Sequence, residues 1–202
     1  MKNKRFMKFL IFNTIWAIAN NITTPFLSTY QIKELGFSMS FIAAVTVALS
    51  FLNMLAVYLT GKYSIKHSYS SILFASFVFG LIGFALILFT NTVNSHVMFT
   101  IYRIFTLFFG ATSSVSITSL LFSIVSENER TSALAFKSII TGLFGFVTTL
   151  LINPLFFMLQ NSDITLFGVR IFAQQALALI SFIITAFLII YYAIFCRHFT
   201  EE

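Results

Sequence analysis

Six apolar stretches, each about as long as a bilayer crossing, occupy most of this 202-residue chain. One helical crossing takes about 20 mostly apolar residues. The windows of this length are residues 9–30, 41–59, 71–90, 97–124, 133–159 and 166–195. The segments between them are short, so no separate soluble domain fits. We therefore predict an all-α membrane protein whose six transmembrane helices form one domain, residues 9–196, between a basic segment 1–8 and a tail 197–202.

The composition agrees with lipid as the solvent. Charged residues make up 9% of the chain and apolar residues 58%, whereas a soluble domain carries about 25% charged residues. The 28 Phe residues exceed what one water-shielded core of this size could bury. These values exclude a soluble enzyme and a disordered chain. The single cysteine, Cys196, excludes a module held together by disulfides.

Lys and Arg fall mainly on one side of the predicted bundle. Nine of them lie in segment 1–8, in and near the second and fourth turns, and in the tail, against two, Lys33 and Arg170, on the other side. Basic residues mark cytoplasmic loops, so both termini are predicted to be cytoplasmic. Topology and contact with anionic lipid explain the net charge of +6, and no nucleic-acid partner is expected. A cleaved signal peptide is not expected, because the first apolar run continues past residues 17–19.

Polar and small residues inside the predicted spans gather on one face of each helix, as spacings of four and seven residues require. The stripes contain Asn13, Asn20, Asn21 and Thr24; Thr46, Ser50 and Asn53; Arg103, Thr106, Gly110 and Ser114; Gly142, Gly145, Thr149 and Asn153; and Gln174, Ser181 and Thr185. Helix packing explains the Ser, Thr and Gly members best, at roughly 0.6 kcal/mol for each hydrogen bond. For Asn20, Asn21, Asn53 and Asn153, packing and a solute pathway both stay open, because each amide has four hydrogen-bonding sites.

Arg103 is the one fixed charge well inside a predicted span. A long side chain at this depth can lift its guanidinium to the lipid headgroups. The alternative is an anion-binding or gating residue that faces a wet cavity. No Asp or Glu lies inside a predicted span to pair with it, and both interpretations stay open.

The sequence carries no pattern typical of a membrane enzyme. The histidines, His67, His96 and His198, all lie in turns or the tail, so neither a nucleophile with its base nor a zinc site forms inside the spans. The carboxylates also lie outside the spans, and no Gly-rich phosphate loop is present. We expect no catalytic activity, no metal and no cofactor.

Four parts of the chain resemble a known transporter family. The first helix of the family and its turn look like residues 9–16 and 25–38. The cytoplasmic signature turn looks like residues 61–66. The second half of the same unit looks like residues 128–135 with 142–146, followed by Gln174 and Gln175. The chain is similar to one half of a major facilitator superfamily transporter, most closely the C-terminal six-helix half of uncharacterised bacterial members. The signature is Gly-x-x-x-Asp-Arg/Lys-x-Gly, and the chain departs from it at Ile65 and Ser68.

The resemblance implies transport of a small solute across the cell membrane, expected to be a bacterial plasma membrane, by alternating access with a second six-helix half. The stripes fall on the first, second, fourth and fifth helices, which line the cavity in that fold. The implied substrate-pathway residues are Asn20, Asn21, Thr24, Asn53, Arg103, Ser114 and Asn153. The implied cytoplasmic gating turn contains Gly61, Lys62 and Lys66.

Six spans are half of what this family needs. The expected partner is a second copy of the chain, which gives a homodimer, or a separately encoded six-helix half. A truncated, inactive half is an alternative. Two other classes stay open: a substrate-capture subunit of a vitamin-type transporter, and a non-transporting membrane scaffold.

Overall fold

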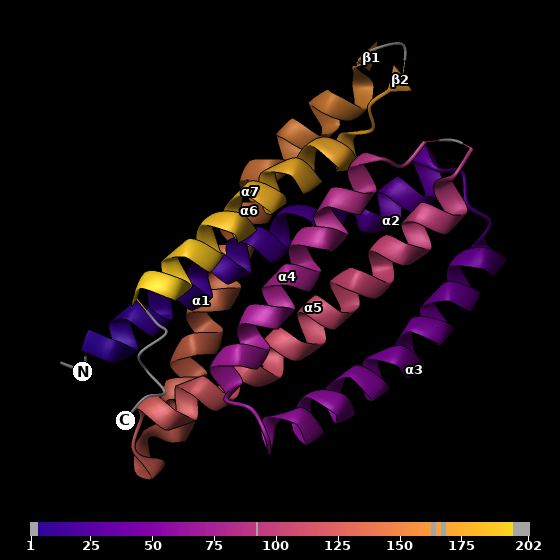
Figure 1. Ribbon diagram of the computed structural model, residues 1–202. Helices are drawn as coiled ribbons and strands as arrows, with labels where there is room; N and C mark the ends of the chain where they lie inside the picture. The colour runs from indigo at the N-terminus through magenta and orange to yellow at the C-terminus, as the bar shows by residue number, and fades with distance from the viewer. Residues whose placement is uncertain (1–3, 92, 163–164, 167–168, 196–202) are drawn as a thin grey trace.

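The computed structural model describes residues 4–91, 93–162, 165–166 and 169–195, and these form an almost entirely helical bundle (Figure 1). The elements, in chain order, are α1 (Lys4–Thr23), a 3-10 turn (Thr24–Phe26), α2 (Leu27–Thr29), a π-helical turn (Tyr30–Glu34), α3 (Met39–Ser64), α4 (Tyr69–Leu88), α5 (Ser95–Ile124), a 3-10 turn (Glu127–Glu129), α6 (Arg130–Asn161), β1 (Thr165–Leu166), β2 (Val169–Arg170) and α7 (Ala173–Phe195). The two short strands pair antiparallel in a hairpin.

Five helical segments of the described chain are long and apolar enough to cross a membrane: Met39–Ser64, Tyr69–Leu88, Ser95–Ile124, Glu127–Asn161 and Ala173–Ile194. The all-helical class is therefore confirmed, and the architecture is compatible with a multi-pass membrane protein. The first predicted span is helical too, but α1 is not one of the five, because basic residues and Asn13, Asn20 and Asn21 make it less apolar. Six crossings and cytoplasmic termini stay predictions.

Local chemistry sets the helix boundaries. Pro25 has no backbone N–H to donate, and the chain tightens there into a 3-10 turn before it resumes as α2. Gly36, at φ +64°, ends this first helical run in a left-handed conformation that favours glycine. Ser38 and Ser68 cap α3 and α4 by accepting backbone N–H bonds. The predicted sixth span began at residue 166, whereas the structure forms the hairpin there and α7 begins only at Ala173.

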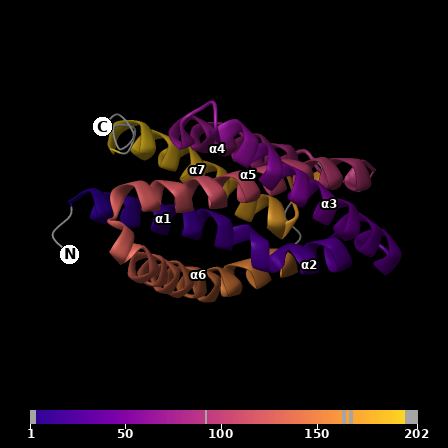
Figure 2. The ribbon, with the colours of Figure 1, turned by 90° about the horizontal axis from the view of Figure 1, so that it is seen from below.

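The long helices pack as two groups of three. α1 packs against α6 and α7, and α5 packs against α3 and α4. The groups meet where α4 packs on α7 and, to a smaller extent, where α1 meets α5. Figure 2 shows α1 and α5 in the middle, with α4 and α7 on one side and α6 on the other. The packing is pseudo-symmetric: α1 corresponds to α5, α3 to α6 and α4 to α7. The pairs α4–α5 and α1–α6 then correspond to the pairs α7–α1 and α5–α3, and the pair α4–α7 corresponds to itself.

Phe residues fill the core and also cover the outer surface. Phe9, Phe12 and Phe77 are at most 1% exposed, whereas Phe51 is 70% exposed and Phe146 is 63% exposed. A soluble protein does not spread such large apolar side chains over its surface. The Phe content is therefore divided between a packed interior and faces suited to lipid or to another apolar protein surface.

Basic residues gather at one end of the bundle. The start of α1, the end of α3, the start of α6 and the end of α7 lie together there (Figure 1). This end carries Lys4, Arg5, Lys62, Lys66 and Arg130. The structure thus brings together these five of the basic residues on which the orientation is predicted.

Candidate functional site

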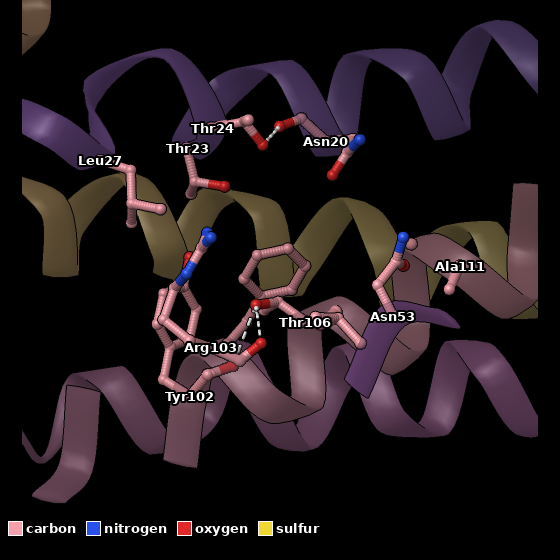
Figure 3. Close-up of a pocket in the computed structure, with 12 residues that line it drawn as sticks. Asn20, Thr23, Thr24, Leu27, Asn53, Tyr102, Arg103, Thr106 and Ala111 are labelled. Atoms are coloured by element: carbon pink, nitrogen blue, oxygen red, sulfur yellow. Dashed lines mark hydrogen bonds between the residues drawn. The ribbon is translucent and has the colours of Figure 1, made fainter. Parts of the chain in front are cut away.

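A polar cavity of about 270 Å³ lies among α1, α3, α4 and α5. Its wall is formed by Asn20, Thr23, Thr24, Leu27, Asn53, Phe84, Tyr102, Arg103, Thr106, Leu107, Gly110 and Ala111. Figure 3 shows polar side chains of α1 facing those of α5 across this space, with Asn53 entering from α3. Four of the predicted pathway residues, which come from three separate parts of the chain, therefore meet here: Asn20, Thr24, Asn53 and Arg103.

The irregular end of α1 shapes one wall of the cavity. Thr24 begins the 3-10 turn, and its Oγ1 donates a hydrogen bond of 2.7 Å to the carbonyl oxygen of Asn20. On the opposite wall, the Oγ1 of Thr106 donates to the carbonyl oxygen of Tyr102 at 2.9 Å. Each hydroxyl proton is thus donated to a backbone carbonyl four residues earlier in the same segment as its threonine. Neither proton is available to a ligand.

Arg103 extends from α5 toward α1 (Figure 3). It is half-buried, and within the described residues its guanidinium has no ion-pair or hydrogen-bond partner. The described carboxylates lie in turns near the helix ends: Glu127 pairs with Arg130 at 3.4 Å, and Glu34 accepts from Gln160 at 3.4 Å. The cavity wall therefore carries one positive charge that no carboxylate of the described chain balances.

Hydrogen bonds separate the asparagines into two kinds. Asn13 donates to Oγ1 of Thr141 on α6 at 2.6 Å, and Asn21 donates to the carbonyl oxygen of Ala17 at 2.8 Å. Asn21 also lies against Gly145 of α6, so it fills a helix interface instead of the cavity. The amides of Asn20 and Asn53, in contrast, have no partner in the described part of the chain.

The remaining predicted pathway residues lie elsewhere. Ser114 is exposed on α5, beyond the part of that helix that lines the cavity, and Asn153 is exposed on α6. Spacing predicts which face of a helix a residue occupies but not its depth along the axis, and Ser114 lies about 16 Å from Arg103 at 1.5 Å per residue. The structure does not bring either side chain to the cavity.

The predicted gating turn lies at the basic end of the bundle. Gly61 and Lys62 belong to the last turns of α3, and Lys66 lies in the connection to α4. All three are exposed, and Lys62 is about 14 Å along α3 from Asn53 at 1.5 Å per residue. Their predicted gating role stays a prediction.

Sequence reasoning missed Thr23 and Tyr102 in the cavity wall and did not recognise how α7 is attached. Gln174 donates to the carbonyl oxygen of Thr23 at 3.0 Å, and Ser181 donates to that of Ala19 at 2.9 Å. Gln175 donates to the carbonyl oxygen of Thr90 at 2.7 Å, just beyond α4. Gln174 and Ser181 of the polar stripe therefore attach α7 to α1, whereas Oγ1 of Thr185 is buried without a partner in the described residues. The only sequence signal for these contacts was the shared face.

No group of three or more His, Cys, Asp or Glu side chains that could hold a metal ion lies in the part of the chain that the structure describes. The fold and the cavity define a class, an all-helical bundle of the multi-pass membrane type with a polar cavity between its helices. No family model matches the chain, and no curated protein or solved structure matches it.

Proposed function

We propose that this chain forms one six-helix half of a major-facilitator-type secondary transporter, which moves a small solute by alternating access with a second half. The observation that carries the proposal is the polar cavity where the two helix groups meet, with α1 on one side and α5 on the other. Transporters of this type bind their solute between the two six-helix halves. The cavity lies within one half but is lined by Asn53 of the exposed helix α3, so a second half packed on α3 would border it.

The packing pattern supports the proposal. The main contacts are unchanged when the first three long helices are exchanged for the last three. Successive helices run in opposite directions (Figure 1), so α5, α6 and α7 run opposite to α1, α3 and α4. An inverted repeat of three plus three helices has this arrangement. A bundle held together only as a scaffold has no need for it.

The two least buried helices support a second half as the partner. Only 11% of the apolar window of α3 and 17% of that of α6 are buried, against 33–39% for α4, α5 and α7. α3 also contributes Asn53 to the cavity, so a partner packed along α3 would border the same space. That partner is a second copy of this chain or a separate six-helix half.

Cysteine labelling tests the cavity. In a Cys196→Ser background, cysteines at Asn20 and Asn53 should react with a membrane-impermeant maleimide in intact vesicles. Ile183→Cys and Phe187→Cys are matched controls, because these α7 residues are 59% and 58% exposed on the outer surface and should be shielded by lipid. If the cavity positions react no faster than the α7 controls, the cavity is not wet and the transport proposal fails.

Cross-linking in native membranes tests the partner. Met54 of α3 and Leu151 of α6 are 70% and 71% exposed, and a cysteine at either position should form cross-links to a second bundle. Cysteines at Ile183 and Phe187 should form far fewer. A protein that remains strictly monomeric contradicts alternating access between two halves and favours the scaffold class.

A further inference from the structure

Three side chains in the cavity wall keep donor groups that nothing in the described chain accepts. They are the guanidinium of Arg103 and the amides of Asn20 and Asn53, which come from α5, α1 and α3. The neighbouring hydroxyls of Thr24 and Thr106 donate to backbone carbonyls, and so they are committed. Uncommitted donors from three separate helices thus meet at one cavity.

The charge balance of the cavity favours a negative ligand. A half-buried guanidinium loses part of its hydration, and a counter-charge with hydrogen-bond acceptors compensates for that cost. The described carboxylates, Glu34, Glu127 and Glu129, lie outside the cavity wall. Guanidinium and amide N–H groups are the donors that match the oxygens of a carboxylate or phosphate, and charge-assisted bonds are about twice as strong as neutral ones.

We propose that the cavity binds a small solute with a single oxyanion headgroup, which Arg103 holds by its guanidinium while Asn20 and Asn53 donate to the same solute. The claim that this anion is the transported substrate rests on the proposed function. The claim that the cavity binds an anion rests on the cavity alone. A space of about 270 Å³ lies below the range that holds drug-sized ligands, so the solute is small. With one unbalanced charge, a monocarboxylate fits better than a di- or tri-anion.

The competing interpretation is that Arg103 only reaches toward the lipid headgroups. The side chain instead extends from α5 toward α1, inside the bundle (Figure 3). A headgroup-reaching arginine also gives no reason for the free amide of Asn20, which is half-buried on another helix. The two interpretations differ in a measurable way, because only the cavity site responds to soluble anions.

Binding is measured on the full chain in nanodiscs of phosphatidylcholine, which has no net charge. The probes are sodium acetate, butyrate, hexanoate and benzoate, their primary amides as neutral matches, and methyl phosphate. The readouts are the melting temperature and the fluorescence of Trp16, the only tryptophan, one turn before Asn20 on α1. A ligand that binds only the folded state raises the melting temperature. At least one carboxylate or methyl phosphate should do so, and the matched amides should not.

Variants connect the response to the residues. Arg103→Gln should weaken anion binding at least about tenfold, and Arg103→Lys should retain part of it. Arg130→Gln is the matched control, because Arg130 pairs with Glu127 at the basic end of the bundle, and its affinity should be unchanged. Asn20→Ala should weaken binding severalfold, whereas Asn21→Ala, at a committed amide, should not. If Arg103→Gln fails to fold, the Lys and Asn20 variants still decide.

The outcomes separate the inference from the proposed function. An anion response that depends on Arg103, without flux in proteoliposomes, supports the binding site while the transport proposal fails. Flux of neutral solutes that Arg103→Gln leaves unchanged supports transport and overturns the anion site. The anion site is also overturned if carboxylates and methyl phosphate act no differently from the amides, or if only phosphatidylglycerol nanodiscs, which offer a lipid headgroup, change the melting temperature.

Discussion

Among the glycines that the structure describes, Gly80 has the least room for an added Cβ. A Cβ built at this α4 residue would lie 2.9 Å from two ring carbons of Phe109 on α5, whereas nothing lies within 4 Å of a Cβ built at Gly142 on α6. Both glycines are helical. Substituting each by alanine therefore makes the same chemical change in two opposite environments.

The expected free-energy changes follow from these distances. Carbon atoms pack at about 3.5–4.0 Å, so alanine at Gly80 intrudes by roughly half an ångström or more. The ring of Phe109 is 1% exposed and packs against Phe77 and Phe84, which leaves it no space to move. Overpacking costs about 1–3 kcal/mol, and alanine recovers about 1 kcal/mol of helix propensity. Gly80→Ala should therefore lower the free energy of unfolding by up to about 2 kcal/mol.

Gly142→Ala gains the propensity without the clash and should be neutral or up to about 1 kcal/mol more stable. Equilibrium unfolding in mixed detergent micelles, followed by far-UV circular dichroism, gives both values. Measurements at two protein concentrations show whether self-association contributes. The reasoning is refuted if the two variants have equal stability, or if Gly80→Ala is the more stable one.

Two further predictions concern hydrogen bonds that join segments distant in the sequence. A double-mutant cycle with Asn13→Ala and Thr141→Ala should give a coupling energy of about 0.6–1.7 kcal/mol in the same unfolding assay, because their bond joins α1 to α6, and additive effects would contradict it. Gln175→Leu should destabilise the protein by about 1–3 kcal/mol, because it leaves the buried carbonyl of Thr90 without its donor. Gln160→Leu is the control: its bond to Glu34 is 3.4 Å long, and the change in stability should be less than about 0.5 kcal/mol. Equal losses of stability in the two variants would refute the distinction.

The helices could be predicted from the sequence because lipid leaves the backbone few alternatives. Polar turns with capping residues, such as Ser38 and Ser68, then mark where helices begin. The start of α7 could not be predicted, because residues 166–172 are apolar enough to read as the beginning of a span, and hydropathy does not distinguish a short hairpin from a helical turn. The structure pairs Leu166 with Val169 there.

The candidate site could be predicted only in part, because periodicity gives a direction around the helix axis and nothing about depth or neighbours. Asn13 and Asn20 share a face of α1 but lie about 10 Å apart along it at 1.5 Å per residue. The amide of Asn13 donates to Thr141, whereas the amide of Asn20 faces the cavity. Which residue lies opposite depends on how α6 and α3 pack, and that is a tertiary property.

The exposed face of α3 can be analysed in the same way, by asking which of its polar side chains already have a hydrogen-bond partner. On α3, Thr46 donates to the carbonyl oxygen of Ile42 at 2.7 Å and Ser50 to that of Thr46 at 2.9 Å, so these exposed hydroxyls need no partner outside their own helix. Apart from Asn53, most of the other exposed side chains in the membrane-length part of α3 are apolar, including Phe51 at 70% exposure. A second bundle could therefore pack along α3 through apolar contacts, and relative sliding would break no hydrogen bond between the bundles. The uncommitted donors of Asn20 and Arg103 would remain at the cavity, where the proposed solute would accept from them.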